Sequence, residues 1–167
     1  MKLPPLVLAC LLAAACGKKG AETSAPTAEA PTATAPTPAA PPLTDSARKT
    51  LLASLPPAYQ GADLDNGEAK AAICRTCHTL TAGGEAMVGP NLHGVFGRKA
   101  ASAPGFAYSD DLKASHIVWD AAAIDRWIAN PKAVAPGTKM TFIGMPNAKD
   151  RADVVAYLKV ATSPPPR

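Results

Sequence analysis

The sequence predicts a small all-α domain with unusually long loops, preceded by an export signal and an extended segment. No stretch alternates apolar and polar residues in the way that a half-buried strand does. Helical spacing is instead present in two stretches, at Ile124, Trp127 and Ile128 and at Val154, Tyr157, Leu158 and Ala161. The region from 79 to 109 is rich in glycine and shows no helical period. We therefore expect helices joined by long loops, with no sheet.

The first fifteen residues have the pattern of a signal for export. Lys2 precedes an apolar run, residues 3–15, that is short for a membrane span and typical of a signal-peptide core. Small residues precede Cys16, as in the bacterial lipobox, where the cysteine is lipidated, although Ala13 stands where leucine is usual. We interpret residues 1–15 as a lipoprotein-type signal peptide and Cys16 as a lipid anchor on the periplasmic side of a bacterial membrane. An ordinary cleaved signal ending near Ala15 and an uncleaved anchor remain open.

A tether is expected between this anchor and the folded domain. Residues 21–42 are almost entirely alanine, proline and threonine, with Glu22 and Glu29 as the only charges. Such a segment buries too little surface to offset the entropy of ordering, and repeated proline keeps it extended. We assign residues 16–56 to the anchor cysteine and tether and residues 57–167 to the domain. A short helix capped by Ser46 and stopped by Pro56-Pro57 is expected near the end of the tether.

The chemistry of the chain is concentrated in Cys74-Arg75-Thr76-Cys77-His78. A helical turn presents residues three and four apart on one side, so both sulfurs and the imidazole can face the same group. The pattern C-x-x-C-H indicates covalent haem attachment, with the thiols on the porphyrin and the imidazole on the iron. A thioredoxin-like redox pair and half of a zinc site are the competing interpretations. Export favours haem, because c-type haem is attached outside the cytoplasm.

Three capped helices are expected in the domain. Asp65 or Asn66 begins the helix that delivers the cysteine motif. Asp120 caps a second helix, ended by Asn130-Pro131, and Asn147 caps the last one. Long structureless loops are uncommon in so small a domain. A porphyrin in the middle would give these loops something to pack on.

From about Ala62 to Thr162 the sequence resembles the class I cytochromes c of the mitochondrial type. The matching segments follow the order of that family: residues 74–78, Gly89-Pro90-Asn91-Leu92-His93-Gly94, Phe96-Gly97-Arg98-Lys99, Pro104-Gly105-Phe106, Tyr108, Trp119, Asn130-Pro131-Lys132, Pro136-Gly137-Thr138-Lys139-Met140 and Ala156-Tyr157-Leu158-Lys159. The resemblance implies a class I cytochrome c fold, with helices and long loops wrapped around one haem c bound covalently through Cys74 and Cys77. The signal and Cys16 make this a bacterial, membrane-anchored lipoprotein form. The zinc and thioredoxin interpretations lose their support.

The resemblance also assigns roles to single side chains. His78 would be the proximal iron ligand and Met140 the distal one, with Met145 as its nearby rival, and such a pair raises the reduction potential. Pro90 would offer its carbonyl to the second imidazole nitrogen. The remaining assignments are haem-propionate partners at Arg98, Tyr108 and Trp119, a hydroxyl beside the methionine at Thr138, and an aromatic shield at Phe142.

Three positions depart from the family pattern. Trp127 stands where tyrosine is frequent near the methionine sulfur, and an indole can donate a hydrogen bond but accept none. Leu112 stands where asparagine is common. We expect a drier distal side and a shifted potential. Ala71 replaces a large aromatic residue in the first helix, so its contact with the last helix should be thinner.

The net charge of the chain limits the classes of function that it can have. The net charge of +4 gives no basic footprint for nucleic acid. Residues 57–167 hold seven lysines and five arginines against eight aspartates and two glutamates, a net of +2, and only Lys132 and Lys139 keep the family's lysine positions at the haem edge. Electrostatic steering should therefore be modest.

We interpret the chain as a monomeric, membrane-tethered electron carrier and not an enzyme. It would pass one electron from a quinol–cytochrome c reductase or a periplasmic dehydrogenase to a terminal oxidase or reductase. The alternatives are a haem peroxidase or small-gas-binding protein with a labile methionine ligand, and an electron-wiring subunit of a larger respiratory complex.

Overall fold

The computed structural model describes residues 43–165. The predicted signal peptide, Cys16 and most of the predicted tether lie outside this range. Within it every regular element is a helix, and the only bridge of the strand type pairs Lys99 with Val118. The prediction of an all-α fold is confirmed. In the span 43–165 no helix combines the length and apolar character needed to cross a bilayer.

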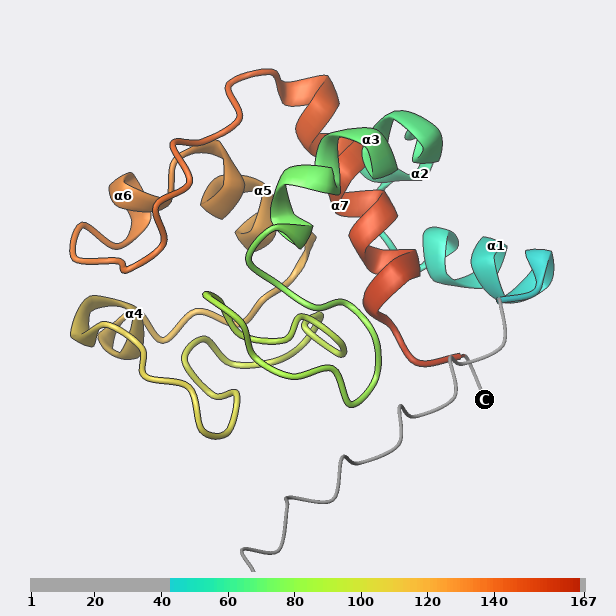
Figure 1. The fold of residues 1–167 in the computed structure, drawn as a ribbon. Helices are drawn as coiled ribbons and strands as arrows, with labels where there is room; N and C mark the ends of the chain where they lie inside the picture. Colours follow the sequence, from blue (N-terminus) through green and yellow to red (C-terminus); the bar gives the residue numbers. More distant parts are fainter. Residues whose placement is uncertain (1–42, 166–167) are drawn as a thin grey trace, which may run out of the picture. The chain divides into compact units, whose positions relative to one another are not determined.

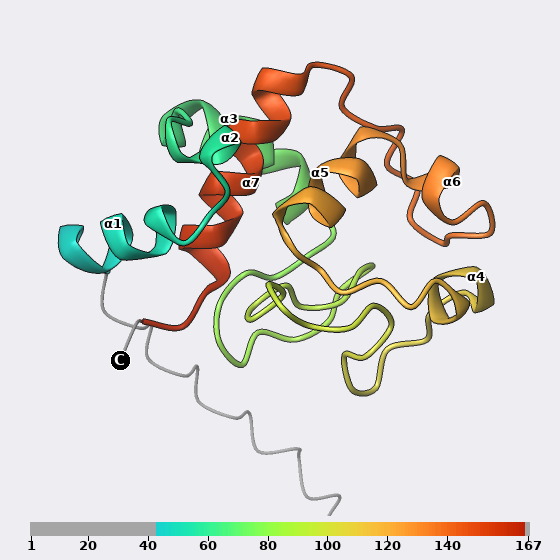
Figure 2. The same ribbon diagram turned by 180° about the vertical axis from the view of Figure 1, so that it is seen from behind.

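Helix α7 (Ala148–Thr162) is the centre of the helical part and contacts four other helices (Figures 1 and 2). Its most extensive contact is with α3 (Leu64–Arg75). The two backbones approach closely at Gly67, where an added Cβ would overlap the carbonyl oxygen of Asp153 and lie 2.9 Å from the Cβ of Tyr157. One turn later on α3, Ala71 is fully buried. The small-residue contact between these helices is as the sequence predicts.

The N-terminal region differs from the prediction. Helix α1 (Asp45–Ala53) is capped by the side chain of Thr44 rather than Ser46, and Pro57 does not end a helix but begins α2 (Pro57–Gln60). Both helices pack against α7 and bury Leu51, Leu55 and Tyr59. Helix α1, which lies on the N-terminal side of the boundary that we placed at residue 57, thus packs on the domain through its contact with α7.

Each of the remaining helices begins at a capping side chain, but three of them differ from the prediction. Asp120 caps α5 (Ala121–Ala129), Asn130 caps α6 (Pro131–Val134) and Asn147 caps α7, so the predicted caps of α5 and α7 are confirmed. Helix α3 begins two or three residues early, because the side chain of Asp63, rather than Asp65 or Asn66, caps it and accepts from the N–H groups of residues 65 and 66. Helix α4 (Asp110–Ala114), capped by Ser109, and the short helix α6 were not predicted.

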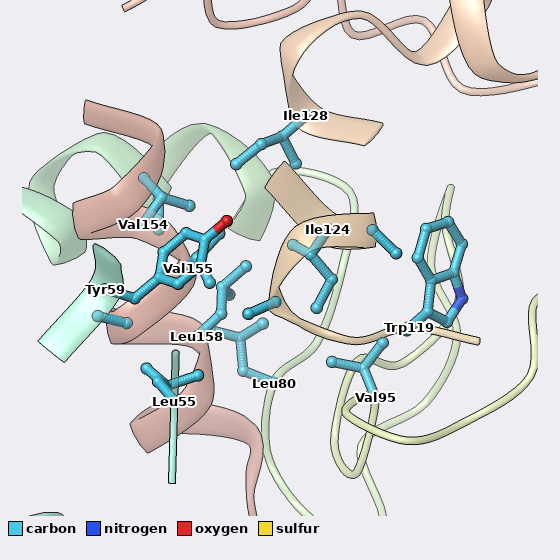
Figure 3. Packing of buried hydrophobic residues seen from close by; sticks show 14 of the residues in the cluster. Leu55, Tyr59, Leu80, Val95, Trp119, Ile124, Ile128, Val154, Val155 and Leu158 are labelled. Carbon is cyan, nitrogen blue, oxygen red and sulfur yellow. The ribbon is translucent and has the colours of Figure 1, made fainter. Parts of the chain in front are cut away.

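The apolar core lies between α5 and α7 and extends to the long loops. Ile124 and Ile128 of α5 lie with Val155 and Leu158 of α7, and Leu80 and Val95 come from the loops (Figure 3). The loops contribute to this core although they have no regular structure. This arrangement gives the segment between α3 and α4 a fixed position against the helices.

A buried carboxylate joins the start of α3 to α7. Asp153 is 1% exposed, and its oxygens accept from the Asp63 N–H at 2.9 Å, from Asn66 Nδ2 at 2.8 Å and from Lys149 Nζ at 2.7 Å. Burial alone would raise the pKa of Asp153, but these three hydrogen bonds outweigh it and hold the pKa below its usual 3.8. The ionised form therefore stabilises the α3–α7 pair.

Replacing this carboxylate should weaken the fold in a pH-dependent way. Asp153→Asn should lower the free energy of unfolding at pH 7 by about 1–3 kcal/mol, because buried hydrogen bonds to a charged acceptor are lost. The contribution of a carboxyl with a lowered pKa is present above its unfolded value, near 3.8, and is lost as the pH falls through the folded value. Denaturant unfolding of both proteins at pH 7 and pH 3 should show the difference shrinking at pH 3.

Asp65→Asn is the matched control, since Asp65 is exposed at the start of the same helix. It should change stability much less at both pH values. Equal losses for the two variants, or a loss at Asp153 that does not shrink in acid, would contradict this account.

Candidate functional site

A cavity of about 560 Å³ opens between the loops and the helices. Its size falls in the range of roughly 300–1,000 Å³ found for cofactor and ligand sites. All ten side chains that the sequence assigned to a cofactor site lie on its wall: Cys74, Cys77, His78, Pro90, Arg98, Tyr108, Trp119, Thr138, Met140 and Phe142. They come from the end of α3, the long loop after it, the segment that leads into α5 and the loop after α6. The structure therefore gathers residues that are up to 68 positions apart.

The cysteine motif reaches the wall because α3 continues into one further turn. The N–H groups of Cys77 and His78 both donate to the carbonyl of Cys74, at 3.2 and 2.9 Å. This turn places both cysteines and the imidazole on the cavity. Both cysteines are free thiols in the structure, and burial raises the pKa of the Cys74 thiol. They are available for a covalent bond to a group in the cavity.

The His78 ring is fixed by the loop that follows it. Its Nδ1 lies 2.6 Å from the carbonyl oxygen of Pro90, which can only accept, so Nδ1 carries the proton and Nε2 keeps a free lone pair. Burial lowers the pKa of His78 and outweighs the opposite effect of this hydrogen bond. The ring is thus a neutral imidazole with one nitrogen committed and one able to bind a metal.

Gly89 makes this arrangement sterically possible. A Cβ at Gly89 would lie 2.7 Å from Nδ1 and 2.8 Å from Nε2 of His78, closer than unbonded atoms can pack. The Gly89 N–H donates to the carbonyl of Cys77 at 2.8 Å, which pulls the loop against the ring. Only a residue without a side chain can take this position.

Further hydrogen bonds stiffen the loop around Pro90. The side-chain amide of Asn91 donates to Thr79 Oγ1 at 2.8 Å and to the carbonyl of Thr81 at 2.9 Å. Thr79 in turn donates to the carbonyl of Glu85 at 2.7 Å. These hydrogen bonds join the chain before Pro90 to the chain after it. The Pro90 carbonyl that accepts from His78 therefore has little freedom to move.

Met140 is the methionine that lines the cavity. Its N–H donates to Thr138 Oγ1 at 3.2 Å, and Lys139 between them donates to the carbonyl of Ala107 at 2.9 Å. Met145 packs against the core, its N–H bonded to the carbonyl of Ile128, and is absent from the cavity wall; Met87 is 52% exposed. Of the methionines in residues 43–165, Met140 alone is positioned toward a group in the cavity.

The polar side chains of the cavity wall use only part of their hydrogen-bonding capacity within the protein. Arg98 donates to the carbonyls of Asn91 and His93, at 3.0 and 3.2 Å, which leaves its other N–H groups available. Burial raises the pKa of Tyr108, so its hydroxyl stays protonated and able to donate. Trp119 is buried and meets Trp127 edge to face at a centroid distance of 5.4 Å.

Two of the three departures from the family pattern lie on the wall as well. Trp127 and Leu112 both line the cavity. Leu112 is buried and Trp127 half-buried. Neither can accept a hydrogen bond, which suits the drier distal side that the sequence predicts.

The donor set fits a haem better than a single ion. No three His, Cys, Asp or Glu side chains among residues 43–165 are close enough together to hold a metal ion, so Cys74, Cys77 and His78 do not converge on one point. They are spread over the wall of a large, mainly apolar cavity instead. Two thiols, one imidazole with a free Nε2 and one thioether are the groups that attach and ligate a c-type haem.

Comparisons with known proteins agree with this donor set. No model of a protein family matches the chain. It is 48% identical over 101 residues to a cytochrome c2 of Rhodomicrobium vannielii, which covers 60% of this chain and 81% of that protein. The chain belongs to the cytochrome c family. Membership implies a covalently bound haem c, and the fold is that of a class I cytochrome c.

Two further relatives extend the comparison. A cytochrome c of Kluyveromyces lactis is 47% identical over 85 residues, which is 51% of this chain and 77% of that protein. A protein of Rhodobacter capsulatus named cytochrome c-type cyt cy is 43% identical over 111 residues, 62% of this chain and 55% of its own length. In each case the matched part is shorter than the present chain.

Some features of the site have no signal in the sequence. Gly89 was noted only as part of a matching segment, because its contact with the His78 ring depends on how the loop folds. The cavity rim formed by Ile73, Val88 and Ile143 was also missed. Val88 and Ile143 lie in loops without a period that would reveal them, and nothing in the sequence of α3 shows that Ile73 is exposed.

Adding a methyl group at Gly89 should disturb the site. Gly89→Ala should displace the His78 ring, because the new Cβ would overlap it. We expect a lower yield of protein with covalent haem and a changed ferric absorption spectrum, measured after export in a host that attaches haem c.

Gly61→Ala is the control, since a Cβ at Gly61 meets nothing within 4 Å. It should keep both the yield and the spectrum of the natural chain. A Gly89→Ala protein with unchanged yield and spectrum would show that the His78 ring is not held as described.

Proposed function

We propose that this protein is a membrane-tethered monohaem c-type cytochrome that carries single electrons. Its donor would be a quinol–cytochrome c reductase or a periplasmic dehydrogenase, and its acceptor a terminal oxidase or reductase. The observation that carries the proposal is the meeting of Cys74, Cys77, His78 and Met140 on one cavity wall in a chain of the cytochrome c family.

Each of these residues has a distinct task. Cys74 and Cys77 would hold the haem through thioether bonds, His78 through Nε2 and Met140 through its sulfur. When bound, the haem supplies one iron that alternates between the ferrous and ferric states. A thioether favours the ferrous state, so a histidine–methionine pair raises the reduction potential. The Pro90 carbonyl keeps Nε2 directed into the cavity.

The surrounding residues would keep the site rigid and dry. Leu112, Ile124 and Leu158 are buried apolar side chains on the cavity wall, which exclude water from it. Arg98, Tyr108 and Trp119 would donate to the propionates, and Phe142 would cover the haem edge. With both axial positions taken by the protein, little needs to rearrange when an electron arrives, which suits a carrier.

The structure favours electron transfer over peroxide or gas chemistry. His78 is the single histidine among the cavity-lining residues of the described chain, so no second imidazole is at hand to move a proton on the other side. The iron position opposite His78 would be taken by Met140, which lines the cavity as well. A peroxidase would need a free cation or imidazole beside an open coordination position.

Removing the proposed distal ligand tests the iron site. Met140→Ala should lower the midpoint potential by on the order of 0.1 V, because the ligand that stabilises ferrous iron is lost. The ferric spectrum should also lose the weak long-wavelength band of methionine-ligated haem. Spectroelectrochemical titration measures both.

Met145→Leu is the control, because Met145 does not line the cavity. It should keep the potential and the band of the natural chain. The assignment of Met140 fails if the Met140→Ala protein keeps the band, or if Met145→Leu loses it.

The tether is proposed from the sequence, and the position of α1 is compatible with it. No residue of α1 or α2 lines the cavity, so the chain joins the domain away from the cavity mouth. A lipid at Cys16 would hold the domain near membrane partners and raise its effective concentration, to about the millimolar scale for suitable linkers. The cavity mouth would stay free for a partner.

The mature N-terminus tests this part of the proposal. Protein extracted from membranes should begin at Cys16 and carry the mass of attached lipid on that residue. Replacing residues 1–16 with an ordinary cleaved export signal should release the protein into the periplasmic fraction with its haem. An unmodified N-terminus near residue 16, or retention of the signal, would favour the alternatives of an ordinary secreted protein or an uncleaved anchor.

A further inference from the structure

The chain that follows Met140 is held at its two ends and not between them. In the part of the chain that the structure describes, no residue from 141 to 144 takes part in a main-chain hydrogen bond. Before this segment, the N–H of Met140 donates to Thr138 Oγ1. After it, the N–H of Met145 donates to the carbonyl of Ile128 at 2.8 Å. Anchors outside the segment therefore determine where the Met140 thioether lies.

Gly144 brings the end of this segment against α5. Its φ of +107° lies in the range that favours glycine, and a Cβ there would overlap the carbonyl oxygen of Ala129. Together with the bond between Met145 and Ile128, this contact places the chain after Met140 beside the last turn of α5. Any loosening of this contact would free the segment that carries Met140.

Arg151 of α7 closes this contact from the other side. Its Nη1 donates to the carbonyl of Met145 at 3.0 Å and to the carbonyl of Pro146 at 2.8 Å. Its Nε donates to Oδ1 of Asp125, on α5, at 2.6 Å. A planar guanidinium can make these three bonds at once, whereas the single ammonium of a lysine cannot reach all three acceptors in this geometry. One side chain thus joins α7, α5 and the chain after Met140.

The pair of Asp125 and Arg151 is also the most protected ion pair in the span 43–165. Its two side chains are 15 and 27% exposed, and every other pair there has at least one partner that is more than 40% exposed. Partial burial weakens the competition of water for these bonds and strengthens them electrostatically. An exposed ion pair would contribute little.

Tyr59 of α2 lies beside this ion pair. Its side chain is buried, and its hydroxyl oxygen is directed toward α5 (Figure 3). Burial raises the pKa of the Tyr59 hydroxyl, and the nearby charge of Asp125 raises it further. The hydroxyl stays protonated and can donate. Helix α2 precedes the stretch that resembles the cytochromes c, which begins near Ala62, so this neighbour lies outside the family pattern.

We propose that Asp125 and Arg151 are positioning residues for Met140, and that α2 supports them through Tyr59. The proposal rests on the proposed function, in which Met140 is the distal ligand. None of the three supporting residues lines the cavity, so they would act through the chain that they hold. A looser anchor would increase the fraction of molecules in which Met140 is away from the iron, and an added ligand would then bind more easily.

Imidazole is the probe, because it binds ferric haem iron and would have to displace Met140 to do so. The full-length ferric haem protein, in non-ionic detergent, is titrated with imidazole. Loss of the weak long-wavelength band of methionine-ligated haem gives an apparent dissociation constant. This constant falls in proportion as the fraction with a free iron position rises.

Asp125→Ala should lower the apparent dissociation constant of imidazole about tenfold. That factor corresponds to about 1.4 kcal/mol, the size expected for loss of a hydrogen bond between charged groups. Arg151→Lys keeps the charge but not the three bonds, and should lower the constant by a similar factor. Asp125→Glu keeps the carboxylate and should stay within about twofold of the natural chain. Tyr59→Phe removes only the hydroxyl and should lower the constant about threefold.

Asp153→Asn is the matched control. Asp153 lies on α7 like Arg151, but its hydrogen bonds go to the start of α3 and to Lys149 and not to the chain after Met140. This variant should lose stability in denaturant unfolding while its imidazole constant stays within about twofold of the natural value.

Unchanged imidazole constants in Asp125→Ala and Arg151→Lys would overturn the proposal. An equal fall in Asp153→Asn would overturn it too, because the effect would then follow general stability and not the position of Met140. An unchanged constant in Tyr59→Phe would overturn the part assigned to α2. A wrong assignment of Met140 itself would look different, since the natural ferric protein would then have no long-wavelength band for imidazole to remove.

Discussion

A large apolar cavity is the constraint on which the rest of this structure depends. Its walls come from the end of α3, the long loop between α3 and α4, the helices α4, α5 and α7, the segment before α5 and the loop after α6. Apolar walls exposed to water are unfavourable, and loops without regular structure have few contacts of their own. A covalently attached haem would resolve both difficulties, because it would cover the walls and give the loops a common surface. The helices α3 and α7 then fix where the attachment begins.

On the side of the cavity that holds His78, the fold fixes the positions of single atoms. The pairing of α3 with α7 is closed by Gly67 and by the buried Asp153, and it sets the direction in which α3 delivers Cys74. The loop that follows returns so that Gly89 passes under the His78 ring and the Pro90 carbonyl meets Nδ1. The protein itself therefore orients the imidazole, through the Pro90 carbonyl, without a contribution from a metal.

Most of the site could be predicted from the sequence, and parts of the fold could not. The ten wall residues belong to motifs that follow one another in a fixed order in the family. The resemblance to that family therefore assigns them to one site, and all ten line the cavity. Asp120 and Asn147 are each the single capping candidate before a stretch with a clear helical period, so the sequence identifies both caps. Asp63, Asp65 and Asn66 can all cap a helix, and only the geometry of the chain selects Asp63. Helix α4 has five residues, too few for a period, and the docking of α1 depends on a partner face that its own sequence does not specify.

The central claim is that both cysteines of the motif bind one haem, and the mass of the intact exported protein tests it most directly. Protein made with an ordinary cleaved export signal in place of residues 1–16, in a host that attaches haem c, is denatured and treated with a thiol-alkylating reagent. It should exceed the polypeptide mass by one haem and take up no reagent at Cys74 or Cys77. Peptide mapping should place the haem on the segment that contains both residues. Alkylation of both thiols, or a disulfide between them with no added haem, would contradict the account.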